Sequence, residues 1–77
     1  MHVLLTELSN VPHREGQEVL RVRDGAYLLQ CEFIGGQYWL HLFAVQKDHV
    51  AYTRMVRDAA TVDDVRKVGR WMLKQSR

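Results

Sequence analysis

The stretch CEFIGGQYWLHLF, residues 31–43, decides the fold that the sequence predicts. Two runs of alternating strand-forming residues flank the pair Gly35-Gly36. A two-residue turn of type I′ requires a positive φ at both central residues, and glycine adopts such a φ without steric cost. We therefore expect a β-hairpin in which these cross-strand pairs form: Phe33 with Tyr38, Cys31 with Leu40, and Leu29 with Leu42.

A second turn signal, Asp24-Gly25, lies between two further alternating segments. With this pair as a two-residue loop, Val22 lies opposite Tyr27 in a second hairpin. A slip of either hairpin by one residue would mix apolar with polar side chains. In the expected registers, one face of the sheet collects nine apolar side chains: Leu20, Val22, Tyr27, Leu29, Cys31, Phe33, Tyr38, Leu40 and Leu42.

The segments on either side of this meander give weaker patterns. The sequence predicts a short first strand, Val3 to Leu8, followed by a loop from Ser9 to Gln17 that holds the only proline. The segment 49–57 alternates and is rich in Val, Tyr and Thr, which favours a fourth strand after a turn at residues 47–49. The alternative for this segment is the start of a helix.

The C-terminal segment has the pattern of an amphipathic helix. Thr61 suits the N-cap, and the carboxylates of Asp63 and Asp64 in the first turn complement the helix dipole. The predicted fold is α+β: a three- to four-stranded antiparallel β-meander packed on one C-terminal helix of about residues 62–75, in a single domain with its sheet in residues 1–57. An apolar stripe at three- and four-residue spacing should face the sheet: Val62, Val65, Val68, Gly69, Met72 and Leu73.

Composition places the chain among ordinary globular proteins. Its 77 residues suffice for one domain with a thin core, and 47% are hydrophobic while 26% are charged. The single cysteine cannot form an internal disulfide, which favours a cytoplasmic location. We expect neither membrane insertion nor secretion, because no apolar run approaches the roughly 20 residues of a transmembrane helix and the N-terminus lacks a basic leader.

Charge is distributed unevenly along the chain. The net charge is +2, yet residues 61–77 carry five Lys and Arg against two Asp. Such a local excess favours an anionic partner. These cations should form a stripe on the outer side of the helix, suited to a phosphate backbone or an acidic protein surface, or else simply a solvated face: Arg66, Lys67, Arg70, Lys74 and Arg77.

The outer face of the predicted sheet is the second candidate surface. Trp39, His41 and Phe43 recur at every second position and so share this face. Aromatic side chains beside arginines can stack bases and neutralise phosphates, although Glu32 opposite Trp39 opposes a phosphate track. The alternative is that the N-terminal strand, the Pro12 loop or a second copy of the chain covers the face. Its expected members are Val19, Arg21, Arg23, Leu28, Gln30, Glu32, Ile34, Trp39, His41, Phe43 and Val45.

Metal and catalytic sites are not indicated by the sequence. The residues His2, His13, His41, His49 and Cys31 include no closely spaced ligand pair. Cys31 is expected mid-strand on the core face, where a thiol is inert, and no glycine-rich loop precedes a helix. We therefore expect a non-enzymatic protein without a metal or cofactor.

Two functional hypotheses follow. The first is a small regulatory protein that binds nucleic acid through Arg21, Arg23 and Arg54 or through the helix cations, with bases on Trp39, His41 and Phe43. A meander backed by a C-terminal helix is similar in topology to AP2-type domains and the arm-binding domains of phage integrases, although no sequence signature of either occurs here. The second hypothesis is an inhibitor or adaptor, possibly homodimeric, that binds a protein partner with Trp39 and Phe43 as anchors.

Overall fold

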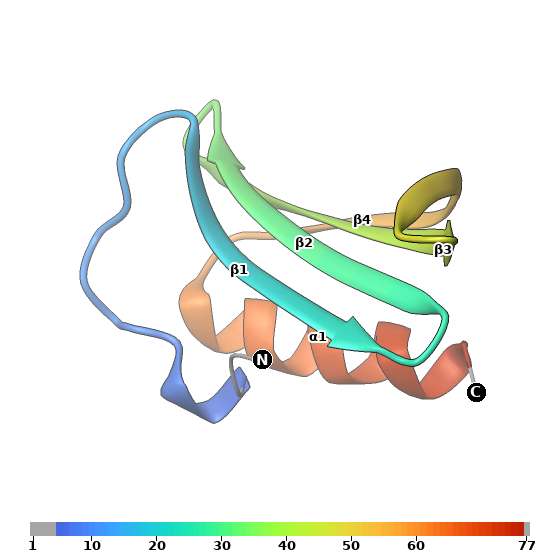
Figure 1. Ribbon diagram of the computed structural model, residues 1–77. Helices are drawn as coiled ribbons and strands as arrows, with labels where there is room; N and C mark the ends of the chain where they lie inside the picture. Colours follow the sequence, from blue (N-terminus) through green and yellow to red (C-terminus); the bar gives the residue numbers. More distant parts are fainter. Residues whose placement is uncertain (1–4, 77) are drawn as a thin grey trace.

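The computed structural model describes residues 5–76 as a four-stranded antiparallel sheet with one helix against it (Figure 1). The strands follow one another in the order β1-β2-β3-β4, so each pairs with its neighbour in sequence. This architecture confirms the predicted α+β meander. The elements are the 3₁₀ turn η1 (Leu5–Glu7), β1 (Gln17–Asp24), β2 (Tyr27–Ile34), β3 (Gln37–Gln46), β4 (His49–Ala59) and the helix α1 (Val62–Gln75).

The β2–β3 hairpin has the register that the sequence predicts. Gly35 and Gly36 form the turn with φ of 64° and 75°, as a type I′ turn requires. Phe33 pairs with Tyr38, and the pairs Cys31–Leu40 and Leu29–Leu42 follow. The side chains of these last four residues are completely buried. The centre of the core is therefore set by this hairpin.

The β1–β2 hairpin differs from the expected register by two residues. Asp24 pairs with Tyr27, so the loop is Gly25-Ala26 and Val22 lies opposite Leu29 instead of Tyr27. Of the two loop residues only Gly25 has a positive φ, the pattern of a type II′ turn with glycine at its first central position. A shift of two residues leaves each side chain on its face. The predicted apolar face is thus correct: seven of its nine members are buried, and Tyr27 and Phe33 pack against them.

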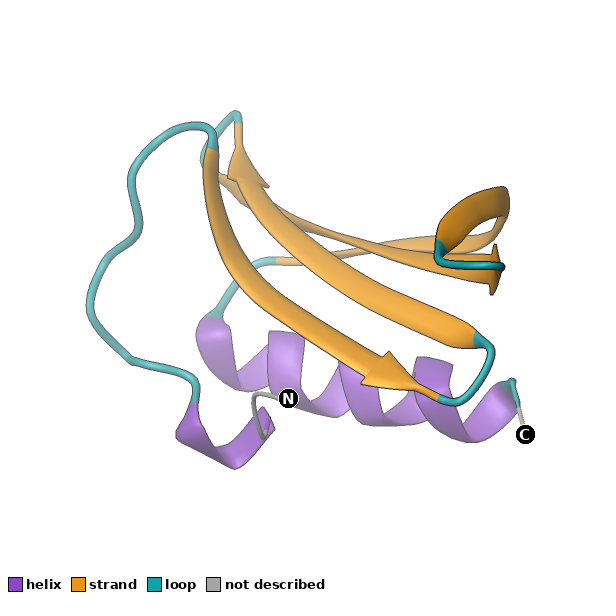
Figure 2. Ribbon diagram, in the orientation of Figure 1, coloured by secondary structure: helices purple, strands orange, loops and turns teal. Residues whose placement is uncertain are grey.

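The segment before the sheet is not the predicted strand. Its described part, residues 5–8, is a 3₁₀ turn followed by Leu8, while residues 3 and 4 lie outside the described residues. Side chains three residues apart lie above one another in a 3₁₀ turn, and both Leu5 and Leu8 reach the core. A long loop then leads to β1 (Figure 2), so the sheet spans Gln17–Ala59 rather than starting at the chain's beginning.

Bulges bend both edges of the sheet. In β1 the pairing shifts between Glu18 and Leu20, and Val19 packs against the core instead of facing outward as predicted. The segment 49–57 is strand, as favoured above, and β4 extends it to Ala59. Two register shifts between β3 and β4 accompany the curl of this hairpin over the outer face (Figure 1). The hairpin turn is Lys47-Asp48, with φ of 50° and 66°.

Helix α1 covers the inner face of the sheet. The Thr61 side chain caps it by accepting a hydrogen bond from the Asp64 amide at 3.2 Å, as predicted. Val65, Met72 and Leu73 are buried, and Gly69 lies so close to the sheet that a Cβ atom there would be 3.2 Å from Leu29 Cδ2. No helix in the described part of the chain is long and apolar enough to cross a membrane.

Arg66 ties the N-terminal segment to the helix. Its guanidinium donates hydrogen bonds to the carbonyl oxygens of Leu5, at 3.2 Å, and of Leu8. It also donates to Asn10 Oδ1 at 3.2 Å and Asp63 Oδ1 at 2.8 Å. The Arg66 side chain is only 16% exposed. Arg66 is therefore a structural residue that holds η1 and the following loop against α1.

Replacement of Arg66 by alanine should destabilise the fold. The substitution leaves partly buried carbonyl oxygens of Leu5 and Leu8 without their donor, and hydrogen bonds to charged groups contribute about 1.5–3 kcal/mol each. We expect the free energy of unfolding in urea to fall by about 2 kcal/mol for Arg66→Ala. The matched control Arg70→Ala, on the exposed side of the same helix, should change it by less than about 0.5 kcal/mol. Equal effects of the two substitutions would contradict the structural role of Arg66.

Candidate functional site

The outer face of the sheet carries the three aromatic residues that the sequence placed there. Trp39 is 36% exposed, while His41 and Phe43 are partly buried and their rings stack, with centroids 5.7 Å apart and an interplanar angle of 4°. Their cross-strand partners on β2 are Glu32, Gln30 and Leu28. The structure therefore brings Trp39, His41 and Phe43 together on one face, in surroundings that are part apolar and part acidic.

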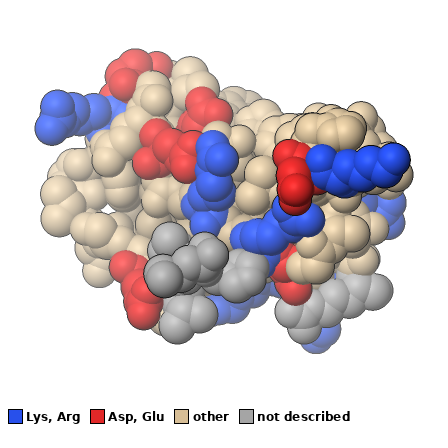
Figure 3. Space-filling view, in the orientation of Figure 1, with Lys and Arg blue, Asp and Glu red and all other residues tan. Residues whose placement is uncertain are grey.

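The arginines of this face are already engaged. Arg21 donates two hydrogen bonds to the Glu18 carboxylate, at 3.0 and 2.9 Å, and Gln30 donates a third at 2.9 Å. The hydrogen bond from Arg21 lowers the pKa of Glu18 and keeps this carboxylate charged. Arg23 donates to the Gly25 carbonyl at 2.7 Å. On the side shown in Figure 3, positive and negative side chains are interspersed. The outer face is therefore electrostatically mixed rather than basic.

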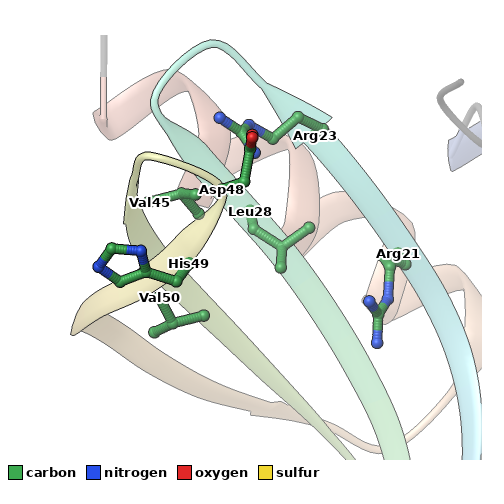
Figure 4. Close-up of a pocket in the computed structure, with 7 residues that line it drawn as sticks. All are labelled: Arg21, Arg23, Leu28, Val45, Asp48, His49 and Val50. Carbon is green, nitrogen blue, oxygen red and sulfur yellow. The ribbon is translucent and has the colours of Figure 1, made fainter.

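A pocket of about 360 Å³ opens on the outer face where the β3–β4 hairpin curls over β1 and β2 (Figure 4). We call it the sheet pocket. Leu28 and Val45 give it an apolar floor, and Val45 is only 8% exposed. Charged groups of both signs surround this floor. The lining residues are Arg21, Arg23, Leu28, Val45, Asp48, His49 and Val50.

Arg54 does not join the other arginines of the sheet. It lies at the bulge between β3 and β4, where its guanidinium is 5.9 Å from the centroid of the Tyr27 ring. Tyr27 packs against the core beneath the sheet. Arg54 is thus on the helix side, whereas Trp39 and Arg21 are on the outer side, and a single flat ligand cannot contact all three.

The basic stripe of α1 separates into two groups. Arg66 is taken up by the contacts with the N-terminal segment, and Arg77 lies outside the described residues. Lys67, Arg70 and Lys74 are exposed, and no hydrogen bond or ion pair within residues 5–76 engages their side chains. These three cations are therefore available to an external partner.

Trp71 is a surface residue that the sequence analysis missed. It is 45% exposed on α1, and the guanidinium of Arg57 from β4 lies 5.5 Å from its ring centroid. The sequence pattern does place Trp71 beside the helix cations. Together with Lys67, Arg70 and Lys74 it has the i, i+3, i+4, i+7 spacing of one helix face. We define the helix-edge surface as Arg57, Lys67, Arg70, Trp71 and Lys74.

A second pocket, of about 250 Å³, lies within this surface, and we call it the helix-edge pocket. It is lined by Trp71, Val68 and Lys67 of α1 together with Arg57 and Asp58 of β4. The Asp58 side chain itself lies on the outer face of the sheet, because Asp58 pairs with Trp39, and its Oδ2 atom accepts a hydrogen bond from Gln37 Nε2 at 2.9 Å. The helix-edge surface thus combines four cations, one exposed indole and a small apolar depression.

The remaining polar chemistry of the fold is structural. His13 Nδ1 and the Tyr38 hydroxyl are hydrogen-bonded at 2.9 Å, which fastens the N-terminal loop to β3. No group of three or more His, Cys, Asp or Glu side chains in the described part of the chain could hold a metal ion; His2 lies outside that part. Burial, and secondarily the charge of Glu32, raises the pKa of the Cys31 thiol to about 12.

The buried thiol gives the protein a pH-dependent stability. A thiol whose pKa rises from about 9 in the unfolded chain to about 12 on folding stabilises the fold fully below pH 9 and loses this contribution above it. We expect the free energy of unfolding to fall between pH 9 and 11. In Cys31→Ala it should fall less, because only other groups whose pKa is raised by folding, such as Tyr38, then contribute. Disulfide exchange with a soluble aromatic reagent at pH 8 should proceed only as fast as the protein unfolds. Rapid modification of the native protein would contradict the burial of Cys31.

The chain matches no protein-family model, and neither a curated protein nor a solved structure shows significant similarity to it.

Proposed function

We propose that this is a non-enzymatic nucleic-acid-binding protein that contacts phosphates through the helix-edge surface. The observation that carries the proposal is the placement of Lys67, Arg70 and Lys74, free of partners within residues 5–76, around the exposed Trp71. Cations supply the affinity of most protein–nucleic acid contacts, and an aromatic platform supplies stacking. The protein would act as a regulator by occupying its site on the nucleic acid.

The helix-edge surface suits phosphates better than the outer sheet face does. On the sheet face, Arg21 is paired with Glu18, and Glu32 lies directly opposite Trp39. A phosphate there would have to compete with carboxylates for the same donors. The carboxylate of Asp58, the β4 partner of Trp39, also lies on the sheet face, where it accepts a hydrogen bond from Gln37. On the helix edge, by contrast, no carboxylate within residues 5–76 is paired with Lys67, Arg70 or Lys74.

The dimensions of the stripe fit a phosphate backbone. A helix rises 1.5 Å per residue, so Lys67 and Lys74 are separated by about 10 Å along the axis. Each strand of a duplex places one phosphate per 3.4 Å of its axis, so a stripe of this length faces about three phosphates. Arg57 on β4, whose Nη1 donates a hydrogen bond to the Val56 carbonyl at 2.7 Å and whose charge is not paired by that contact, adds a fourth cation beside the stripe. Four neutralised phosphates correspond to a salt slope, d log K/d log [salt], of about −2.8 on a single strand and about −3.6 on a duplex.

The proposal predicts a steep salt dependence that the helix cations control. The affinity for a single-stranded oligonucleotide, measured by fluorescence anisotropy between 50 and 200 mM salt, should give a slope of about −3 for the unaltered protein. The double variant Lys67→Gln with Lys74→Gln should reduce the slope by about half. The matched double variant Arg21→Gln with Arg23→Gln, on the sheet face, should leave the slope unchanged. Binding that is indifferent to salt, or a slope that responds only to the sheet-face pair, would refute the proposal.

The outer sheet face favours a second candidate function, the binding of a protein partner. The observation is the combination of exposed apolar side chains with charges of both signs: Trp39, Ile34 and Val56 are at least 36% exposed, and Arg21, Glu18 and Glu32 lie among them. Such a face resembles a protein interface, with aromatic anchors and a mixed polar rim. A second copy of the chain is one such partner.

Self-association through this face is directly measurable. If Trp39 anchors a homodimer, sedimentation equilibrium should give twice the chain mass for the unaltered protein and a mass close to that of the monomer for Trp39→Ala. Trp71→Ala, which alters the other exposed tryptophan, serves as the control and should leave the dimer intact. A mass that is the same for the unaltered protein and for Trp39→Ala would exclude the outer face as a dimer interface.

A further inference from the structure

We infer that the helix-edge pocket receives one unpaired base of a single-stranded nucleic acid, stacked on the indole of Trp71. This inference rests on the proposed function and names its ligand class. It is drawn from the shape, the lining and the charge of the pocket between β4 and α1.

The pocket has the size and the surface of a base-stacking site. Its volume of about 250 Å³ lies below the usual range for drug-sized ligands and suits a single flat ring system. Trp71 and Val68 present apolar surface, and the 45% exposure of Trp71 leaves ring area for a ligand to cover. Arg57, whose guanidinium already lies 5.5 Å from the indole centroid, can extend the stack as a second planar group.

The lining of the pocket suits a base, and the cations beside it suit the phosphates. Trp71 and Val68 offer apolar surface on which a neutral ring can stack, whereas a phosphate placed there would lose its hydration. Arg57 and Lys67 add positive charge to the lining. Arg70 and Lys74 do not line the pocket but lie along α1 beside Trp71. The phosphates that flank the inserted base therefore lie against these two cations.

The same geometry disfavours a duplex. Both faces of a paired base are covered by its neighbours, so a duplex must extrude a base before Trp71 can stack on it. Extrusion costs a few kcal/mol, whereas a single strand offers unstacked bases at little cost. The helix-edge surface should thus bind a single strand more tightly than a duplex of the same length, although both are attracted by the cations.

The test uses the intrinsic fluorescence of Trp71. The chain has two tryptophans, so in Trp39→Phe the emission comes from Trp71 alone. Titration with a single-stranded 12-mer should quench this emission, and the matching duplex should bind at least about tenfold more weakly. Trp71→Ala should weaken single-strand binding at least about fivefold, Trp71→Phe should restore part of the loss, and the matched variant Trp39→Ala should change nothing.

The outcomes separate the inference from the proposed function. Salt-dependent binding that is equal for single strand and duplex, and unaffected by Trp71→Ala, would overturn the base-stacking inference while leaving phosphate contact by the helix intact. The absence of salt-dependent binding to either oligonucleotide would overturn both. Quenching of Trp71 by the single strand together with a loss of affinity in Trp71→Ala would establish the stacked base.

Discussion

The close contact between α1 and the sheet at Gly69 fixes how the helix is rotated about its axis. A Cβ atom at this position would lie 3.2 Å from Leu29 Cδ2 and 3.5 Å from Leu40 Cδ2, both from the completely buried centre of the sheet. Glycine within a helix costs about 1 kcal/mol relative to alanine, and here the apolar contacts made by the closer approach offset that cost. Any rotation that moved Gly69 away from Leu29 would drive a larger side chain into the same space.

This rotation decides which residues the helix presents to solvent. Successive residues are about 100° apart around a helix, so Lys67, Arg70, Trp71 and Lys74 all point between about 100° and 200° away from Gly69. The last part of β4 runs beside the helix and adds Arg57 to the same surface. The cations and the indole are therefore collected by backbone geometry, while Arg66, on another side of α1, is used to hold the N-terminal segment.

How far the sequence predicts the molecule depends on the kind of interaction. The pairing of Phe33 with Tyr38 was predictable because two adjacent glycines admit a type I′ turn and the apolar alternation agrees with it. The cross-strand partner of Val22 was not predictable, because Gly25 suits two turn types. A shift of the register by two residues leaves the same side chains on the buried face. The role of Arg66 could not be foreseen, since its carbonyl partners lie 58 and 61 positions away. Trp71 could have been found from its spacing among the cations.

The central claim is that nucleic acid binds at the helix edge and not on the outer face of the sheet, and the two tryptophans report on these surfaces separately. In a ¹H–¹⁵N correlation spectrum, titration with a single-stranded oligonucleotide should shift the indole N–H signal of Trp71 and the amide signals of Arg57 and of residues 67–74. The indole signal of Trp39 and the amides of His41 and Phe43 should stay in place. Shifts confined to Trp39, His41 and Phe43 would contradict the claim.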